Sequence, residues 1–270
     1  EAPAGRGGGD MTGTSEGFGG RGGGGGAAGL KLVPLGVGDA FSERHYSTCL
    51  ALECGGEVLL IDCPHPVLKM MREARLASGV DLAPERVCGV VLTHLHADHA
   101  SGIETLAYYS FFALKRKLKL FAHPAVAKRL WEGHLAAGME CLLPAAGAAH
   151  VEMAMGDYLE LAPLGEGVTS CGPFELEVRP TVHHIPTTAV RVRAAGRSIA
   201  YSADTIYDEG LIAWLLASDL VLHETGLGVH TPYAALASLP PEVRAKMRLV
   251  HYPDTLEGAA IERLREGGVY

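Results

Sequence analysis

The 270-residue sequence contains no apolar run that reaches the ~18 residues needed to cross a membrane. Its first residues also lack the basic-then-apolar order of a secretory signal. Six cysteines are present, but no two form a CxxC pair, and several stand in apolar, strand-like segments where a free Cys behaves as a small hydrophobic residue. Together these absences predict a soluble protein of the reducing cytoplasm, with no membrane partner.

Basic residues are fewer than acidic residues: the sequence has 23 Lys and Arg residues and 31 Asp and Glu residues, which give a formal net charge of −8. A protein whose affinity comes mainly from neutralising phosphates would be expected to carry the opposite sign. Nucleic acid is therefore a disfavoured partner, although a local basic patch is compatible with an acidic whole. Residues 115–119 form a basic cluster, which is typical of a solvated helix end; contact with a phosphate-bearing substrate is the alternative.

Large apolar side chains are almost absent from residues 1–29, which hold 14 of the 35 glycines. Such a segment cannot bury enough apolar surface to offset its loss of backbone entropy. We expect a disordered, Gly-rich tail at 1–29, with Met11 as an alternative native start, followed by a single domain over 30–270. Because this tail has only Arg6 and Arg21 as basic residues, a tail that binds nucleic acid is the less favoured interpretation.

From residue 30 onward the sequence alternates short β-like runs with segments of helical spacing. Gly55-Gly56 separates two of the apolar runs and predicts a hairpin. Residues 141–149 show no clear period and receive no assignment beyond a loop or short helix. Strands are expected at 30–37, 48–53, 57–62, 87–92, 118–122, 158–163, 174–178, 191–195, 198–202, 220–225 and 248–252. Helices are expected at 66–78 and 100–114, from His123 and from Thr231.

The densest group of chemically reactive side chains follows the apolar run 87–92, where His94, His96, Asp98 and His99 stand within six residues. In a regular strand the period of two sends His94 and His96 to the same side, and His99 needs a turn to join them. We expect Asp98 to cap the following helix. Imidazole suits zinc-like metals and a carboxylate adds charge, so the pattern predicts that His94 and His96 hold one cation and Asp98 and His99 another.

His94-Leu95-His96-Ala97-Asp98-His99 resembles the signature of the metallo-β-lactamase fold superfamily. The resemblance implies an α/β protein built as a four-layer αββα sandwich, a layer order that periodicity alone does not fix. In that superfamily further ligands follow in the order His, bridging Asp, His. This chain offers His183, Asp204 and His251 in suitable surroundings, and the matched region covers nearly the whole chain from residue 30 to residue 254.

Residues 182–191 look most like the ribonuclease Z-like phosphodiesterase branch, where a ligand His stands three residues before a Pro. That spacing selects His183, and His184 is the alternative ligand if the strand carries a bulge. The sequence departs from this branch at Ala189-Val190, where the branch tends to have Gly followed by an aromatic residue.

The resemblance implies two divalent metal ions, with zinc the expected element and Mn or Fe also accepted by this mixture of ligands. His94, His96 and His183 would hold the first ion, and Asp98, His99 and His251 the second. Asp204 would bridge both ions. A carboxylate suits this place because the combined charge of the two ions would keep it ionised.

Other residues are expected to support the ligands or the chemistry. Asp62 ends an apolar strand and is interpreted as a residue that orients a ligand, as an Asp at the matching place does in the family. His223 and Glu224 are candidates for the same role, with a merely structural role as the alternative. His230 matches a His that serves in proton transfer in the ribonuclease Z-like branch, so Asp98 and His230 are the predicted catalytic residues. The loop 36–46 is expected either to border the site or to be an ordinary surface loop.

The sequence therefore predicts a binuclear metal-dependent hydrolase that cleaves phosphodiester-type bonds, with a metal-bridging hydroxide as nucleophile. Hydrolysis of a β-lactam, lactone or thioester is the alternative within enzymes, since fold does not fix substrate. A noncatalytic metal-binding or nucleic-acid-binding protein is the alternative from another class. The expected partner is a small-molecule ester substrate, and a homodimer is compatible with the sequence.

Overall fold

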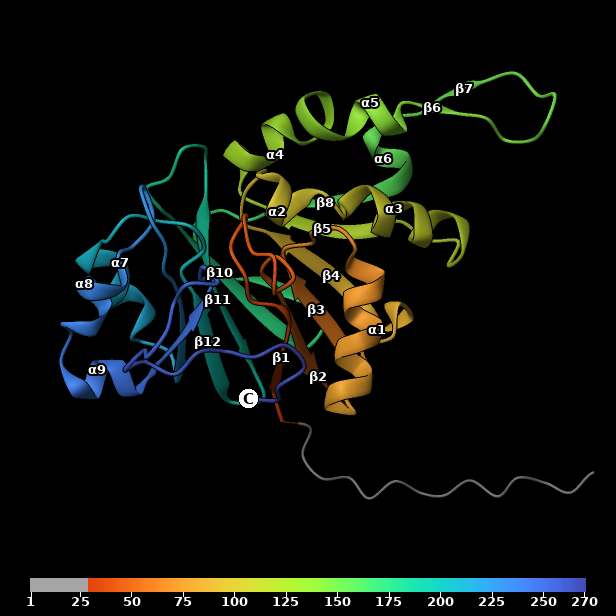
Figure 1. Ribbon diagram of the computed structural model, residues 1–270. Coiled ribbons are helices and arrows are strands. Elements are labelled where there is room, and N and C mark those ends of the chain that lie inside the picture. The colour runs from red at the N-terminus through yellow and green to blue at the C-terminus, as the bar shows by residue number, and fades with distance from the viewer. Residues whose placement is uncertain (1–28) are drawn as a thin grey trace, which may run out of the picture.

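The computed structural model describes residues 29–270, so the predicted tail lies outside the described residues except for Gly29. Two six-stranded sheets face each other, and helices cover their outer sides (Figure 1). The first sheet consists of β1 (Lys31–Gly36), β2 (Cys49–Cys54), β3 (Glu57–Ile61), β4 (Val87–Leu92), β5 (Leu118–Ala122) and β8 (Leu159–Pro163), in that order. The second consists of β14 (Met247–Val250), β13 (Leu220–Glu224), β12 (Arg197–Tyr201), β11 (Thr188–Ala194), β10 (Phe174–Pro180) and β9 (Thr169–Cys171).

Helices of the first half cover one outer face and helices of the second half cover the other (Figure 1). The first half contains α1 (Val67–Ser78), η1 (Pro84–Arg86), α2 (Ala97–Ala100), α3 (Ile103–Phe112), α4 (Pro124–Leu130), η2 (Trp131–Leu135), α5 (Ala136–Met139) and α6 (Met155–Tyr158). The second half contains α7 (Glu209–Leu215), α8 (Tyr233–Ala237) and α9 (Pro241–Ala245). No helix within residues 29–270 is both long and apolar enough to span a membrane.

The strands of the first sheet are apolar on both faces because each face packs against another layer. In β2, Leu50 and Leu52 join a buried cluster shared with the second sheet, whereas Cys49 and Ala51 join a cluster shared with α1 and α3. Helix α1 packs its apolar side into this second cluster through residues such as Met70. The four-layer αββα sandwich predicted from the sequence is therefore confirmed.

The predicted helix over residues 100–114 is wrong in its extent, because the chain forms α2 and α3 as separate helices. The break is at Gly102, whose amide donates a hydrogen bond to the carbonyl oxygen of Cys63 at 2.8 Å. A Cβ at this position would lie 2.5 Å from the carbonyl oxygen of Pro64. Gly102 is thus required for the close approach of the chain that follows β3. Residues 141–149, left unassigned above, begin a small hairpin of β6 (Cys141–Leu142) and β7 (Val151–Glu152) that projects from the molecule (Figure 1).

The carboxyl ends of the parallel strands converge on one edge of the sandwich. β3 is parallel to β4, and β12 and β14 are both parallel to β13. The two sheets are joined at this edge by a hydrogen bond of 3.1 Å from the amide of Thr188 to the carbonyl oxygen of Thr93. Every segment that carries a predicted metal ligand therefore leaves a sheet at this edge.

Candidate metal centre

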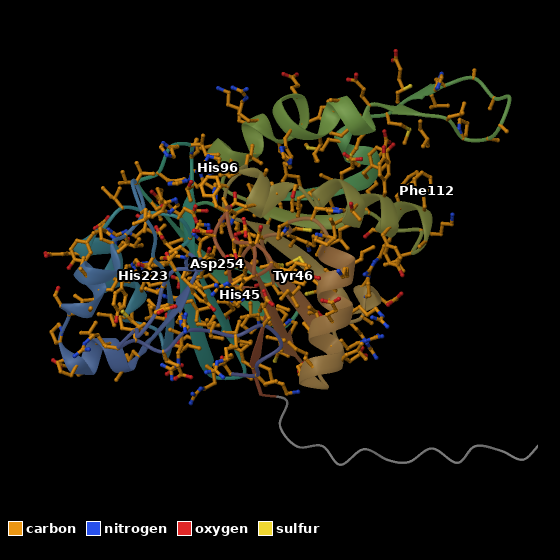
Figure 2. The ribbon with its side chains drawn as sticks, in the orientation of Figure 1. His45, Tyr46, His96, Phe112, His223 and Asp254 are labelled. Atoms are coloured by element: carbon orange, nitrogen blue, oxygen red, sulfur yellow. The ribbon has the colours of Figure 1, made fainter. Side chains whose placement is uncertain are left out.

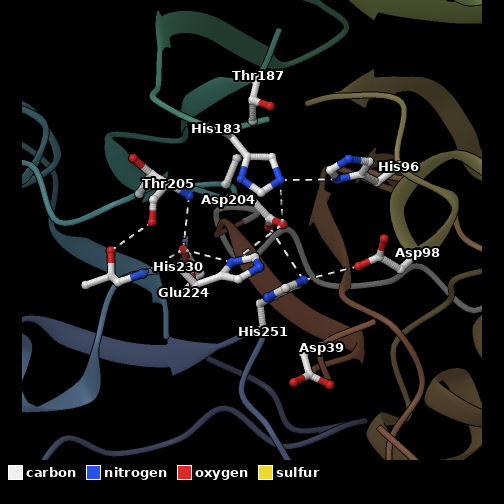
Figure 3. A network of polar contacts seen from close by, with 12 residues as sticks. Asp39, His96, Asp98, His183, Thr187, Asp204, Thr205, Glu224, His230 and His251 are labelled. Carbon is white, nitrogen blue, oxygen red and sulfur yellow. Dashed lines mark hydrogen bonds and ion pairs between the residues drawn. The ribbon is translucent and has the colours of Figure 1, made fainter. Parts of the chain in front are cut away.

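The side chains of His94, His96 and His183, from two loops, meet Asp204 at this edge. Figure 3 shows His96, His183 and Asp204 of this group. His94 Nε2 lies 3.1 Å from His96 Nδ1, and His183 Nε2 lies 3.2 Å from the same atom. Asp204 Oδ2 is 3.8 Å from His94 Nε2 and 3.6 Å from His183 Nε2. These four residues, which the sequence placed around the first metal, form a group able to hold one ion.

The residues predicted for the second metal form a second group beside the first. Asp98 Oδ2 lies 3.3 Å from His99 Nε2 and 3.2 Å from His251 Nε2. Asp204 turns its other oxygen, Oδ1, toward this group, at 3.4 Å from His99 Nε2 and 3.6 Å from His251 Nε2. The two oxygens of one carboxylate thus face both groups, as a bridging ligand requires.

Several buried polar atoms in these groups have no hydrogen-bond partner within the described part of the chain, among them His99 Nε2 and Asp204 Oδ1. Leaving such atoms unpaired in a protein interior is costly, and the cost disappears if they ligate a cation. The mixture of imidazole nitrogen and carboxylate oxygen also matches the ligands that zinc and related metals accept. The residues present therefore fit divalent metal ions.

The protonation of the histidines differs between the two groups. Burial lowers the pKa of His94, and it lowers the pKa of His183 to about 4. Both rings are therefore neutral near pH 7 and keep a lone pair for a metal. Burial also opposes charge on His99 and His251, but Asp204 and the other nearby carboxylates outweigh it and raise the pKa of both rings. A cation bound there displaces protons, so its affinity rises with pH.

The predicted capping role of Asp98 is wrong. Helix α2 begins at Ala97, its N-cap residue is His96, and no side chain caps it. The Asp98 carboxylate, in the first turn of α2, instead points to His99 and His251, because a local cap would have to compete with these two charge-assisted contacts. The strand β4 also ends at Leu92, so the loop conformation and not strand alternation brings His94 and His96 together.

Asp62 lies directly beneath the motif, in a left-handed conformation with φ 62° that ends β3. Its buried carboxylate accepts hydrogen bonds of 2.8 Å from the Thr93 amide and from His99 Nδ1. Thr93 Oγ1 lies 2.8 Å from Asp62 Oδ1 and 3.0 Å from His94 Nδ1. These contacts orient both rings so that Nε2 is directed at the ligand groups. The geometry agrees with the role expected for Asp62, and Thr93 is a partner that the sequence interpretation missed.

Glu224, at the end of β13, is fully buried and holds His230 (Figure 3). Its Oε1 lies 3.3 Å from His230 Nδ1 and accepts hydrogen bonds from the amides of Thr205 at 3.0 Å and Thr231 at 3.2 Å. The hydrogen bond to Glu224 is the main cause that raises the pKa of His230. Glu224 therefore favours the protonated form of His230 and contacts the ring through Nδ1.

His223 lies on the other face of β13, as strand alternation requires for the neighbour of Glu224. Its Nδ1 is 2.7 Å from the carbonyl oxygen of Glu224, and among residues 29–270 no hydrogen bond or ion pair joins it to the ligand groups. Figure 2 shows His223 among the side chains of the second half, apart from His96. The structure thus brings Glu224 to the site and leaves His223 in the core.

The two adjacent histidines before β11 differ in their surroundings. The His183 side chain is almost completely buried against Asp204, whereas His184 is exposed at the rim with its ring 6.2 Å from that of His96. We expect the His183→Ala variant to lose more metal than the His184→Ala variant when both are measured by elemental analysis after purification. If the His184→Ala variant lost more metal, His184 and not His183 would be the ligand.

A cavity of about 490 Å³ opens above the ligand groups. Besides the predicted residues it is lined by Asp39, Ala40, Phe41, Ala97, Gly226 and Leu227. The loop 36–46 therefore borders the site, as one of the two interpretations held. Leu227 was missed, and the only signal for it is its position between Gly226 and Gly228, just after a strand that ends in polar residues. The basic cluster at 115–119 does not line this cavity.

Two facing sheets, four layers and ligand groups at the carboxyl ends of the strands define a metallo-β-lactamase-fold protein, as the His94–His99 motif indicated. Within this class, the chain belongs to the family described as anti-Pycsar protein Apyc1, whose family model matches residues 30–267. It is similar to the anti-Pycsar protein Apyc1 of Bacillus phage BSP38, with 32% identity over 239 residues that make up 83% of this chain and 89% of the relative.

Solved structures agree with the fold. The metallo-β-lactamase fold protein YhfI from Bacillus subtilis superimposes with a TM-score of 0.70 at 17% identity, covering 89% of this chain and 98% of that protein. The short form of human tRNase Z superimposes with a TM-score of 0.60 at 18% identity, covering 89% and 98% of the two chains. The resemblance to ribonuclease Z seen in the sequence thus extends to the arrangement of layers.

Proposed function

We propose that this protein is a metal-dependent phosphodiesterase with two metal sites. The observation that carries the proposal is the pair formed by Glu224 and His230, because His230 lines the same cavity as the two ligand groups and the buried Glu224 holds it there. A protonated imidazole beside a metal site suits a reaction whose leaving group is a poorly stabilised oxygen anion. The names of the similar proteins, anti-Pycsar protein and tRNase Z, are compatible with cleavage of phosphate esters.

The proposed ligands are those predicted from the sequence, with His94, His96 and His183 on one ion, Asp98, His99 and His251 on the other, and Asp204 between them. Zinc is the proposed metal, with Mn and Fe as the other candidates. When bound, two such cations supply an activated water and positive charge for the oxygens of the substrate phosphate.

The protein's own residues would then control position and proton transfer. Asp204 fixes the two groups relative to each other because it faces both, and Asp98 holds the second group together because it contacts both His99 and His251. Glu224 holds His230 by Nδ1, so the proton at Nε2 is available to the leaving oxygen. The buried Glu224 carboxylate raises the pKa of His230 and so favours the protonated ring.

The test combines metal analysis with a substrate panel. Purified protein would be assayed with a phosphodiester, a phosphomonoester, a phosphotriester, a lactone and a chromogenic β-lactam, before and after chelation and after restoring each metal. We expect close to two metals per chain and turnover of the phosphodiester that chelation abolishes. Turnover of only the lactone or β-lactam would show that the enzyme attacks a carbonyl carbon and not phosphorus. Full metal content with no turnover of any substrate would favour the noncatalytic alternative.

A further inference from the structure

The two most exposed large apolar side chains of residues 29–270 both line the metal cavity. Phe41 is 90% exposed and Leu227 is 82% exposed, whereas the next, Leu76, is 66% exposed and lies on α1 outside the cavity. Single exposed apolar residues are ordinary on protein surfaces, but two that share one cavity with a set of metal ligands are not. We propose that Phe41 and Leu227 form an apolar clamp that holds a flat aromatic group of the substrate, such as an aryl ring or a nucleobase.

Phe41 is exposed although its backbone is held firmly. Its amide donates a 3.0 Å hydrogen bond to Asp39 Oδ1, and the Asp39 amide donates to the carbonyl oxygen of Tyr252 at 3.3 Å. On the other side, Ser42 Oγ and the Glu43 amide both donate to the carboxylate of Asp254. The loop is thus attached to the chain just after His251. An aromatic side chain on a loop already fixed in place loses little conformational freedom when a ligand covers it, which favours binding.

Leu227 is placed by the loop that also carries His230. The Gly226 amide and Thr225 Oγ1 both donate to the carbonyl oxygen of Thr231, at 3.1 and 2.9 Å, so the loop closes on itself. A Cβ at Gly226 would lie 3.0 Å from His230 Cβ, which shows how closely the two residues approach. Leu227 therefore stands beside the proposed proton donor, on the side of the cavity where the leaving group would lie.

The cavity matches a small amphiphilic ligand better than a protein surface. Its volume of about 490 Å³ is within the range of ~300–1,000 Å³ that small-molecule sites occupy. The ligand groups at its floor suit a phosphate, and the two apolar side chains at its exposed rim suit a ring attached to that phosphate. Stacking on Phe41 would select by shape and polarisability rather than by hydrogen bonds, so several different rings would be accepted. The inference rests on the proposed function for the phosphate end of the ligand only.

The experiment compares two probes that differ only in the apolar group, phenyl phosphate and methyl phosphate, by calorimetric titration of the metal-loaded protein. We expect the wild type to bind phenyl phosphate more tightly. Phe41→Ala should weaken the binding of phenyl phosphate by about tenfold, the size expected for one lost stacking contact. Leu227→Ala should also weaken it, through the lost apolar contact, and neither substitution should change the binding of methyl phosphate. Phe41→Tyr should keep the preference. For phosphodiesters with an aryl group, KM should rise while kcat changes little.

Matched controls are Leu76→Ala and Phe112→Ala, which remove exposed side chains of the same kinds outside the cavity. Figure 2 shows Phe112 far from His96, at the end of α3. Equal weakening of both probes in Phe41→Ala would overturn the clamp, since it would show a change in the loop rather than a lost apolar contact. Unchanged binding together with a lower oligomeric state by size-exclusion chromatography would assign Phe41 to contact with a second copy of the chain. If the wild type prefers phenyl phosphate but cleaves no phosphodiester, the clamp stands and the proposed function fails.

Discussion

The Asp204→Ala variant is expected to lose both metals and almost all activity, the largest effect of any single substitution in this protein. Asp204 is buried, and its two oxygens face separate groups, with His94 and His183 on one side and His99 and His251 on the other. Removing it takes a ligand from both groups at once and leaves Asp98 as the one carboxylate among the five imidazoles of the two groups. Two-metal catalysis contributes several kcal/mol of charge stabilisation, so turnover should fall by at least about 10³-fold.

Metal content and turnover of Asp204→Ala would be measured on the same preparation. Asp39→Ala is the matched control, because it removes a carboxylate from the same cavity lining and has no contact with either ligand group among the residues described. The control should keep its metals. An Asp204→Ala protein that is fully loaded and turns over normally would disprove the bridging assignment.

The His230→Ala variant is expected to keep its fold and its metals and to lose turnover by roughly 10²- to 10⁴-fold, the range typical of a lost proton donor. His230 is part-buried, and its Nδ1 is occupied by Glu224. The loss should be largest for phosphodiesters with alkoxide-like leaving groups, which need a proton, and small for p-nitrophenolate, which leaves without one. A residue that only positions the substrate would cost similar amounts for both leaving groups.

Two further measurements make this prediction discriminating. Glu224→Gln should show the same dependence on the leaving group in weaker form, because the amide can still contact His230 but no longer stabilises its charge. Elemental analysis of His230→Ala is required, since Asp204, His230 and His251 also lie close enough together to hold an ion. Loss of metal would make His230 a ligand, and equal losses across the leaving groups would make it a binding residue.

Contiguous patterns could be interpreted without the structure. The His94–His99 motif indicated the fold and the location of the site, because ligands one to five residues apart stay together in any compact chain. Asp62 could be assigned a supporting role because a charge at the end of an apolar strand needs a partner, and the structure supplies Thr93 and His99. The choice of His183 over His184 rested on resemblance to a spacing, and burial against Asp204 favours the same residue.

Other features could not be predicted because they depend on close approach of distant segments. The break at Gly102 follows from packing against residues 63 and 64, and helical spacing alone contains no record of that contact. Strand β13 presents His223 and Glu224 to opposite faces, and only the placement of the sheets decides which face meets the site. Phe41 and Leu227 are 186 residues apart in the chain, yet they line one cavity.

The sequence by itself determined which side chains are available and which strand ends they follow, since strand alternation, turns and short motifs are local properties of the chain. The tertiary structure decided which of them meet. Two sheets that pack face to face bring the carboxyl ends of β3, β4, β12, β13 and β14 to one edge, so that Asp204 can face two ligand groups and Asp98 contacts His251 across 153 positions. That convergence depends on the long-range packing of the layers, which no stretch of the sequence encodes alone.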